Sequence, residues 1–547
     1  MHTCLQISEI LRIIFAEVTQ VTGGGVQPSY ALYHLALTCR AFREPALDAL
    51  WAHIPTPDVL VMCLPQDARS QPMLKMTMEN FDQFECTPSG IAAAFRVRLL
   101  RPLTTDDWAT FQMYARRVRS LTFAKYDAES YALMRDRGLH DSAALALLGS
   151  PALPFSPFPL LRELYWNDQR DVLLPCLQRC ISNSLTRLVI HSELWPSAMV
   201  DLVAGLGKAC PMVKEFRCSM PPASACAMIS DIVTYWDDLE ILEMGVVNAQ
   251  QALQHLASLE KLRELKMLVP EGHSLDEDLA STFSVKFSLD EFSITAARIE
   301  PLLAFLAPLK ISAKSANLKI DTASNADDLG QLLSSLIEHF YPNVLESLDV
   351  WMARPTDPTN HALSELSASI FQKIRAFTGL TNLNLSSIHA SMTDHELLDL
   401  ISAWPKMEHF YLNTAWDWGV ARLRVTFHGL AGILERCPNL RSLGVDLDTS
   451  PPHDPPVYVD NQYTGIARDK VTELNVGSAE CNDVETIGSL LAEMCPNLIS
   501  IGRACPVNLN YEDPSANNEW FDGEAKWEEV RGFIAQRRSG QLEQNNV

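Results

Sequence analysis

The chain has 547 residues, which is long for a single compact domain unless the domain is built from repeats. Hydrophobic residues make up 47% and charged residues 20%, which is the composition of a folded protein rather than a disordered one. Acidic residues outnumber basic residues by 67 to 44, giving a formal net charge of −23, and no basic stripe offsets this excess locally. We therefore expect neither nucleic acid nor membrane among the partners.

The 13 cysteines are odd in number and scattered along the chain. Cys176 and Cys180 form the nearest pair, and no second pair with histidine follows at zinc-ligand spacing, so no metal and no cofactor is expected. Buried thiols in a reducing compartment explain this pattern better than disulfides. Glu9 and Arg12 interrupt the N-terminal apolar stretch, and no run of about 18 apolar residues exists. The sequence thus predicts an intracellular protein of the cytoplasm or nucleus, without a signal peptide or transmembrane segment.

Residues 1–53 are predicted to form three short helices. Apolar residues recur at helical spacing in two stretches: Ile7, Ile10, Leu11, Ile14, Phe15 and Val18, then Leu32, Leu35, Ala36 and Cys39. Pro45 can begin a third helix, because the first position of a helix needs no N–H donor. Three helices this short cannot bury so much apolar surface among themselves. Part of it must contact a partner or the rest of the chain.

This N-terminal pattern resembles an F-box, the adaptor-binding module of cullin-type ubiquitin ligases, and most closely the fungal F-box-like family. The resemblance implies that ten residues pack on a Skp-type adaptor or hold the three-helix core: Leu5, Ile7, Leu11, Ile14, Phe15, Leu35, Cys39, Phe42, Leu50 and Trp51. Two features depart from the family, namely Gln6 in place of the usual proline and a long first connection containing Gly23 to Gly25. The alternative is an ordinary N-terminal cap on a larger core.

Residues 54–117 are expected to link this module to the following array and to cap the array. Residues 59–65 look like a helix that is ended by Pro65, and residues 95–99 alternate as a first strand would.

A six-residue phrase then dominates residues 118–510: apolar, x, x, apolar, x, apolar. Its copies begin at Val118, Leu161, Leu185, Val213, Leu239, Leu262, Leu289, Ser315 (a weaker copy), Leu345, Leu380, Met407, Leu440, Val471 and Leu498. The phrase and its spacing are close to those of leucine-rich repeats, with one short strand in each unit. The sequence therefore predicts an irregular α/β solenoid. A doubly wound α/β domain, the competing fold, would need longer and fully apolar strands.

Amphipathic helices are predicted between the phrases, for example at residues 198–206, 428–436 and 487–494. Each of these stretches leads into Cys-Pro, which stops a helix before the next strand. The sequence Cys-Pro-Asn-Leu, at Cys437 and Cys495, is typical of leucine-rich repeats in F-box proteins. The two resemblances therefore support each other.

Residues 511–547 are predicted to end the array with a capping helix and a polar tail. The helix spans about Trp520 to Arg538 and carries Trp527, Val530 and Ile534 on one face. The polar tail after Ser539 is expected to be disordered.

Positions on and just after the strands are the candidates for contact with a protein target. In leucine-rich repeats the x positions face the concave surface, and here they carry mixed charges and aromatic residues. The predicted target-binding residues are Tyr165, Trp166, Arg217, Lys266, Trp351, Tyr411, Trp416 and Trp418. Two alternatives stay open: tryptophans near strand ends are often core residues, and exposed strand positions are often simply polar. The proline-rich insert at residues 449–458 must loop out, as a partner contact or as a tolerated insertion.

One motif suggests catalysis. Asp446-Leu-Asp-Thr449 follows a strand and is similar to the aspartate nucleophile motif of a phosphatase superfamily. That chemistry also needs a phosphate-binding lysine and a downstream acidic pair, and neither accompanies the motif here. We therefore predict no catalytic residues.

Taken together, the sequence predicts a non-catalytic substrate-recognition subunit of a Skp–cullin–F-box ubiquitin ligase. The N-terminal helices would bind the adaptor, which connects to the cullin scaffold, and the solenoid would bind an unidentified protein target. The alternative is a leucine-rich-repeat scaffold for protein interactions with no role in a ligase.

Overall fold

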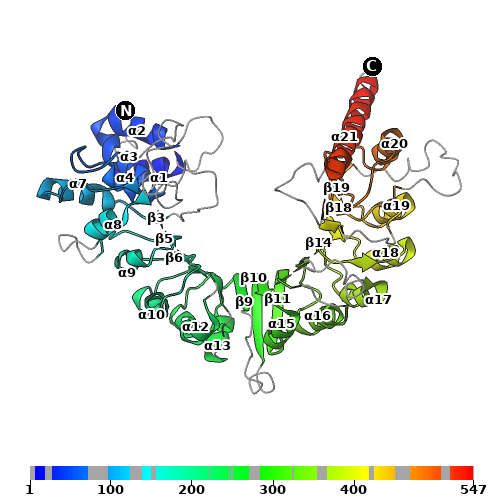
Figure 1. Cartoon of the computed structure of the whole chain (residues 1–547), viewed down its shortest axis with the longest axis horizontal. Helices are drawn as coiled ribbons and strands as arrows, with labels where there is room; N and C mark the ends of the chain where they lie inside the picture. The colour runs from blue at the N-terminus through cyan, green and yellow to red at the C-terminus, as the bar shows by residue number, and fades with distance from the viewer. Residues whose placement is uncertain are drawn as a thin grey trace. The chain divides into compact units, whose positions relative to one another are not determined.

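Figure 1 shows the computed structural model of the chain. It describes residues 7–18, 28–71, 96–123, 138–148, 156–219, 221–245, 247, 250–269, 284–322, 326–353, 366–417, 424–449, 469–506 and 518–545. The chain forms two compact units, Met1–Leu262 and Arg263–Val547.

The first unit begins with three helices and continues as alternating strands and helices. Its strands are β1 (His53–Ile54), β2 (Arg96–Val97), β3 (Ser120–Phe123), β4 (Gly138–Leu139), β5 (Glu163–Trp166), β6 (Arg187–Ile190), β7 (Glu215–Cys218) and β8 (Ile241–Gly245). Its helices are α1 (Ser8–Val18), α2 (Pro28–Thr38), α3 (Arg40–Leu50), α4 (Asp58–Val61), α7 (Thr105–Ala115), α8 (Asp141–Leu148), η2 (Asp171–Leu173), α9 (Leu174–Cys180), α10 (Ser197–Ala204), α11 (Leu206–Ala209), α12 (Ala223–Ser230), η3 (Asp231–Tyr235) and α13 (Gln250–Ser258). Strands β1, β3, β5, β6, β7 and β8 pair in that order, all parallel.

The second unit repeats the same arrangement. Its strands are β9 (Glu264–Val269), β10 (Val285–Ala296), β11 (Leu309–Ile320), β12 (Ser347–Met352), β13 (Leu366–Ser367), β14 (Asn382–Leu385), β15 (Ala390–Ser391), β16 (His409–Leu412), β17 (Trp416–Asp417), β18 (Ser442–Gly444), β19 (Glu473–Asn475), β20 (Ser500–Gly502) and β21 (Cys505–Pro506). Its helices are α15 (Ile299–Leu306), α16 (Ala326–His339), α17 (Ala368–Phe371), η5 (Gln372–Ala376), α18 (Asp394–Ile401), α19 (Phe427–Arg436), α20 (Val484–Met494) and α21 (Asn518–Asn545). Strands β9, β10, β11, β12, β14, β16, β18, β19 and β20 pair in that order, again all parallel.

The six-residue phrase accounts for these rows of strands. All fourteen predicted copies coincide with a strand, from β3 to β20. Within each unit neighbouring copies pair in register, except that the pairing of β11 places its copy two residues earlier than predicted, at Ala313 instead of Ser315. In the first unit, for example, Leu121 pairs with Leu164 and Leu164 with Leu188. Equal phrase positions thus stack into continuous buried rows, which is how a repeat buries a core that no single unit could bury alone.

Parallel pairing in chain order is the architecture of a leucine-rich-repeat-like α/β solenoid. A doubly wound sheet would reverse its strand order, and neither row does so. Within each unit the helices lie along one side of the strands (Figure 1). Helices α19 and α20 end at Cys437 and Cys495, immediately before proline, as predicted.

The first strand of the array differs from the prediction. Residues 95–99 were expected to supply it, but β2 pairs only with β4, in a separate two-stranded sheet. The row begins instead with β1, whose His53 and Ile54 pair with Ser120 and Leu121 of β3. A strand of two residues has too little alternation to stand out in a sequence.

Most of the described cysteine thiols are buried, as predicted. None of the ten described cysteines forms a disulfide, and eight of them are buried. Burial raises the pKa of the Cys176 thiol to about 11 and that of Cys437 to about 11, which keeps both protonated and unreactive at neutral pH.

Helix α21 closes the second unit. Trp527, Val530 and Ile534 are buried, as predicted, and the indole N–H of Trp527 donates to the carbonyl oxygen of Ala479 at 3.0 Å. The expectation of disorder after Ser539 is wrong, because the helix runs to Asn545.

Candidate protein-binding surfaces

The three N-terminal helices share a small core of their own. Leu11 and Phe15 of α1, Leu32 of α2 and Ala46 of α3 are each at most 3% exposed and pack together. The rings of Phe15 and Phe42 meet edge to face, with their centroids 5.5 Å apart. The helices therefore form a packed module.

Five of the ten predicted adaptor-binding residues belong to this core. Leu11 and Phe15 are core residues, and Leu35, Phe42 and Leu50 are half-buried against them. Cys39 is half-buried at the start of α3. Trp51 packs on Tyr114 of α7, with ring centroids 4.5 Å apart. Leu5 lies outside the described residues.

Among the nine described residues of the predicted set, only Ile7 and Ile14 are strongly exposed, at 46% and 41%. The structure adds four exposed apolar residues that the sequence analysis missed: Ile13 (66%), Tyr30 (60%), Tyr33 (51%) and Leu37 (66%). Together these six residues, five of them on α1 and α2 and Ile7 immediately before α1, are called the helical apolar surface below. They are six of the eighteen large apolar residues that are strongly exposed in the described part of the chain.

A sequence signal for the missed residues exists in α2. Tyr30, Tyr33 and Leu37 lie at positions i, i+3 and i+7, which places them on one face of the helix. Leu32 and Leu35 occupy a different face, which packs into the core. A helix that is apolar on two faces can pack one face into the core and leave the other exposed for a partner.

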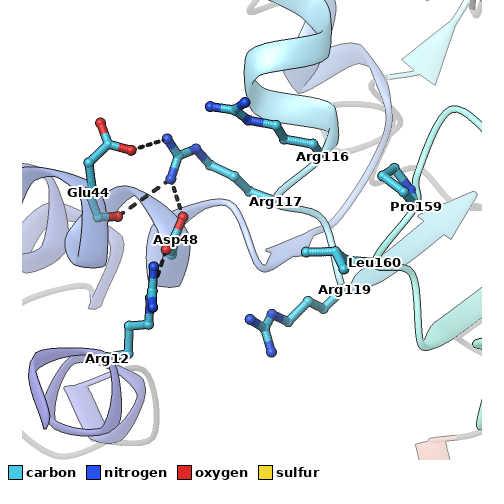
Figure 2. Close-up of a pocket in the computed structure, with 8 residues that line it drawn as sticks. All are labelled: Arg12, Glu44, Asp48, Arg116, Arg117, Arg119, Pro159 and Leu160. Carbon is cyan, nitrogen blue, oxygen red and sulfur yellow. Dashed lines mark hydrogen bonds and ion pairs between the residues drawn. The ribbon is translucent and has the colours of Figure 1, made fainter. Parts of the chain in front are cut away.

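The helical module is also joined firmly to the start of the strand row. The Arg117 side chain is 6% exposed and lies between α7 and α3. Its guanidinium donates to Glu44 at 2.5 Å and also to Asp48 (Figure 2). Burial alone would lower the pKa of Arg117, but the two carboxylates outweigh that effect and raise it. Arg117 therefore stays charged and holds α3 against the array.

The predicted target-binding residues fall on the strands, and their positions differ in exposure. We call the partly exposed strand residues that alternate with the buried rows the open strand face. Tyr165, Arg217, Lys266, Trp351 and Tyr411 all belong to it. The prediction for Trp166 is wrong, because its side chain is completely buried in the core beside Phe123. The side chain of Trp416 and the whole of Trp418 lie outside what the structure describes.

In the first unit, Tyr165 and Arg217 belong to one network across four neighbouring strands. Arg187 donates to the Tyr165 hydroxyl at 3.0 Å and to Glu215 at 2.6 Å. Arg217 bridges Glu215 at 2.8 Å and Glu243 at 3.0 Å. Because the charges alternate and are partly buried, these side chains are held in fixed positions on the open strand face.

In the second unit the open strand face carries separate local pairs. Lys266 pairs with Glu291 at 2.8 Å, and the ammonium of Lys319 lies 5.1 Å from the ring centre of Trp351. The Tyr411 ring covers Gly444, where a Cβ atom would come within 2.3 Å of the ring. A side chain at position 444 would therefore clash with this ring. Burial raises the pKa of the Tyr411 hydroxyl.

The aspartate motif after β18 has a structural role. Asp446 is 4% exposed and accepts hydrogen bonds from the backbone N–H and the hydroxyl of Ser478, at 2.8 and 3.0 Å. Gly477 has a φ of +64° and passes so close that an added Cβ would lie 2.6 Å from the Asp446 carboxylate. The carboxylate thus shapes the turn that follows β19.

A search of the described helices for one long and apolar enough to cross a membrane finds none.

Comparisons with solved structures return likenesses at low sequence identity. No family model and no curated protein matches the sequence. An internalin of Listeria monocytogenes is 14% identical with a TM-score of 0.33, and the match covers 83% of this chain and 98% of that chain. The yeast Rad7–Elc1 complex gives 13% identity and a TM-score of 0.29, with 66% of this chain and 83% of that chain covered. The leucine-rich-repeat protein LegL7 of Legionella pneumophila gives 13% and 0.29, with 49% and 86% covered. Likenesses this remote carry no argument about function.

Proposed function

We propose that this protein is a non-catalytic substrate-recognition subunit of a Skp–cullin–F-box ubiquitin ligase. The helical apolar surface would bind the Skp-type adaptor, and the open strand face would bind a protein target. The ligase would act by proximity, because a scaffold that holds the target near a charged enzyme raises the effective concentration of its lysines.

The observation that supports this proposal is the helical apolar surface itself. Its residues are 41–66% exposed although the same two helices already contribute a complete core on their other faces. Burying one large apolar side chain stabilises a complex by about 1.5–3 kcal/mol, so six such residues are enough for a specific protein contact. The F-box-like sequence of this segment indicates which partner that is.

A second candidate function is supported by the junction behind the helices. Arg117 clamps α3, and the carbonyl oxygen of Ala52 accepts the N–H groups of Arg119 and Ser120 at 2.8 Å each. A helical cap on a leucine-rich-repeat interaction scaffold would be attached in the same way. A test of adaptor binding distinguishes the two functions, because a helical cap would not require outward-facing apolar residues.

The direct test is co-expression of the full chain with a Skp-type adaptor and cullin, followed by affinity purification. Leu37→Asp is the informative variant, because Leu37 is 66% exposed and a charge there leaves the helical core intact. Leu35→Asp is a poorer choice, since Leu35 packs against that core and its loss could unfold the module. We expect Leu37→Asp to abolish recovery of the adaptor, because an unpaired charge in an apolar interface costs about 3 kcal/mol or more.

Leu194→Asp is the matched control. Leu194 is 59% exposed and lies outside the three helices, so adaptor recovery should equal that of the wild type. Equal recovery with Leu37→Asp, or no recovery with the wild type, would leave the cap as the better interpretation of the helices.

A further inference from the structure

A pocket of about 560 Å³ lies between the helical module and the start of the strand row, wholly within the first unit. Its walls come from α1, α3, the segment between α7 and β3, and the turn before β5. It is lined by Arg12, Glu44, Asp48, Arg116, Arg117, Arg119, Pro159 and Leu160. Figure 2 shows the side chains of Arg116, Arg117 and Arg119 extending toward the same side, that of α1 and α3.

The pocket has an excess of positive charge. Its two carboxylates, Glu44 and Asp48, are both engaged: Arg117 binds both, and Arg12 donates to Asp48 at 3.0 Å. Arg116 and Arg119 are exposed and have no ion pair with any described residue. Four guanidinium groups against two carboxylates leave two positive charges unmatched, in a chain whose net charge is −23. Such a local excess favours a negatively charged ligand.

The backbone that carries these arginines is fixed on both sides. The N–H of Arg119 donates to Ala52 at 2.8 Å, and its carbonyl oxygen accepts the N–H groups of Arg162 and Glu163 at 2.8 and 2.9 Å. The backbone N–H of Arg116 donates to the carbonyl oxygen of Gln112 and so closes the last turn of α7. A site held in place before binding loses less conformational entropy when a ligand arrives.

The pocket also offers an apolar contact. Leu160 is 51% exposed at its edge and stands next to Pro159. A free inorganic anion would make no use of this leucine, whereas a peptide that carries an apolar residue beside its acidic groups would use both parts of the pocket. Arginine is well suited to such a ligand because its planar fork binds carboxylate and phosphate oxygens in pairs.

We propose that this pocket binds an acidic peptide segment of a partner protein. Arg116 and Arg119 would pair with its carboxylate or phosphate groups, and Leu160 would pack against a neighbouring apolar side chain. None of these residues belongs to the helical apolar surface, so the site is separate from adaptor binding.

The test uses the purified full chain and three fluorescein-labelled peptides, with binding followed by fluorescence anisotropy. The peptides are Gly-Glu-Glu-Leu-Glu-Gly, a version with phosphoserine in place of each glutamate, and a neutral version with glutamine. We expect the two acidic peptides to bind and the neutral one not to bind, with affinity falling as salt is raised. A stronger phosphopeptide identifies phosphate as the preferred anion, and a stronger glutamate peptide identifies carboxylate.

The double variant Arg116→Gln/Arg119→Gln should weaken binding of the acidic peptides by about tenfold or more, as the loss of one charge-assisted hydrogen bond already implies. Arg98→Gln is the matched control, because Arg98 is exposed in the same unit and does not line the pocket. Its affinity should equal that of the wild type. The proposal is overturned if neither acidic peptide binds, if the neutral peptide binds equally well, or if the double variant binds as tightly as the wild type.

Discussion

Arg117 is the residue on which the attachment of the helical module depends. It is almost fully buried, and both of its carboxylate partners lie on α3, 73 and 69 residues earlier in the chain. A buried ion pair contributes little over an apolar substitute, but removing one partner leaves the others without compensation. The position is therefore a sensitive one for substitution.

We expect Arg117→Met to lower the free energy of unfolding by about 3 kcal/mol, the low end for a broken buried pair, because Glu44 is 60% exposed and stays solvated. Urea denaturation of the full chain would measure this. Arg116→Met is the control on the same segment, and its exposed side chain should change the stability by no more than about 0.5 kcal/mol. Equal losses in the free energy of unfolding for both variants would show that Arg117 does not attach α3 to the array.

Single residues also show what could not be predicted from the sequence, namely which apolar residues are buried and which are exposed. The periodicity of α1 placed Ile14 and Phe15 in one apolar set, but it did not distinguish the core residue Phe15 from Ile14, which is 41% exposed. That distinction depends on how the three helices pack, which a period of 3.6 residues does not contain. Trp166 shows the same limit, since a tryptophan at a strand end suits a core and a binding surface equally well.

At the scale of elements, the repeat phrase predicted the strands well, because each copy carries its own buried pattern of three apolar positions. The exceptions are one strand too short to carry a pattern and one strand that is longer than its phrase. Strand β1 has two residues and is recognisable only through its pairing with β3. Strand β10 has twelve residues and extends beyond its phrase, where Val285 to Leu289 pair with β11 alone.

Helix α21 is the element whose removal should harm the array most. Deleting residues 518–547 would expose the surfaces that Trp527, Val530 and Ile534 now cover, at a cost of about 5 kcal/mol or more for three large side chains. We expect the truncated chain to aggregate in size-exclusion chromatography, as an uncapped solenoid does.

The matched control for this deletion is a shorter one, of residues 540–547, which leaves all three buried side chains of α21 in place. It should elute and melt like the full chain. A monomeric and stable protein without residues 518–547 would mean that α21 does not serve as a cap.

At the scale of the whole molecule, two units share one construction principle, and each presents an open strand face with its own chemistry. The first carries an alternating network of charges around Arg187 and Arg217, and the second carries separate pairs and the close contact of the Tyr411 ring with Gly444. The repeat phrase predicted an α/β solenoid correctly at this level. The identity of the partners depends on the side-chain geometry of these surfaces. Their residues come from several strands, and only the fold brings them together.

Hydrogen–deuterium exchange of the full chain, with and without a purified Skp-type adaptor, tests the central claim most directly. Short helices open locally and exchange readily, and a bound partner slows that exchange. We expect protection to appear in α1 (Ser8–Val18) and α2 (Pro28–Thr38), which carry the helical apolar surface, and to be absent from the strand rows. Unchanged exchange in both helices at saturating adaptor, or protection confined to the strands, would contradict the assignment of this surface to the adaptor.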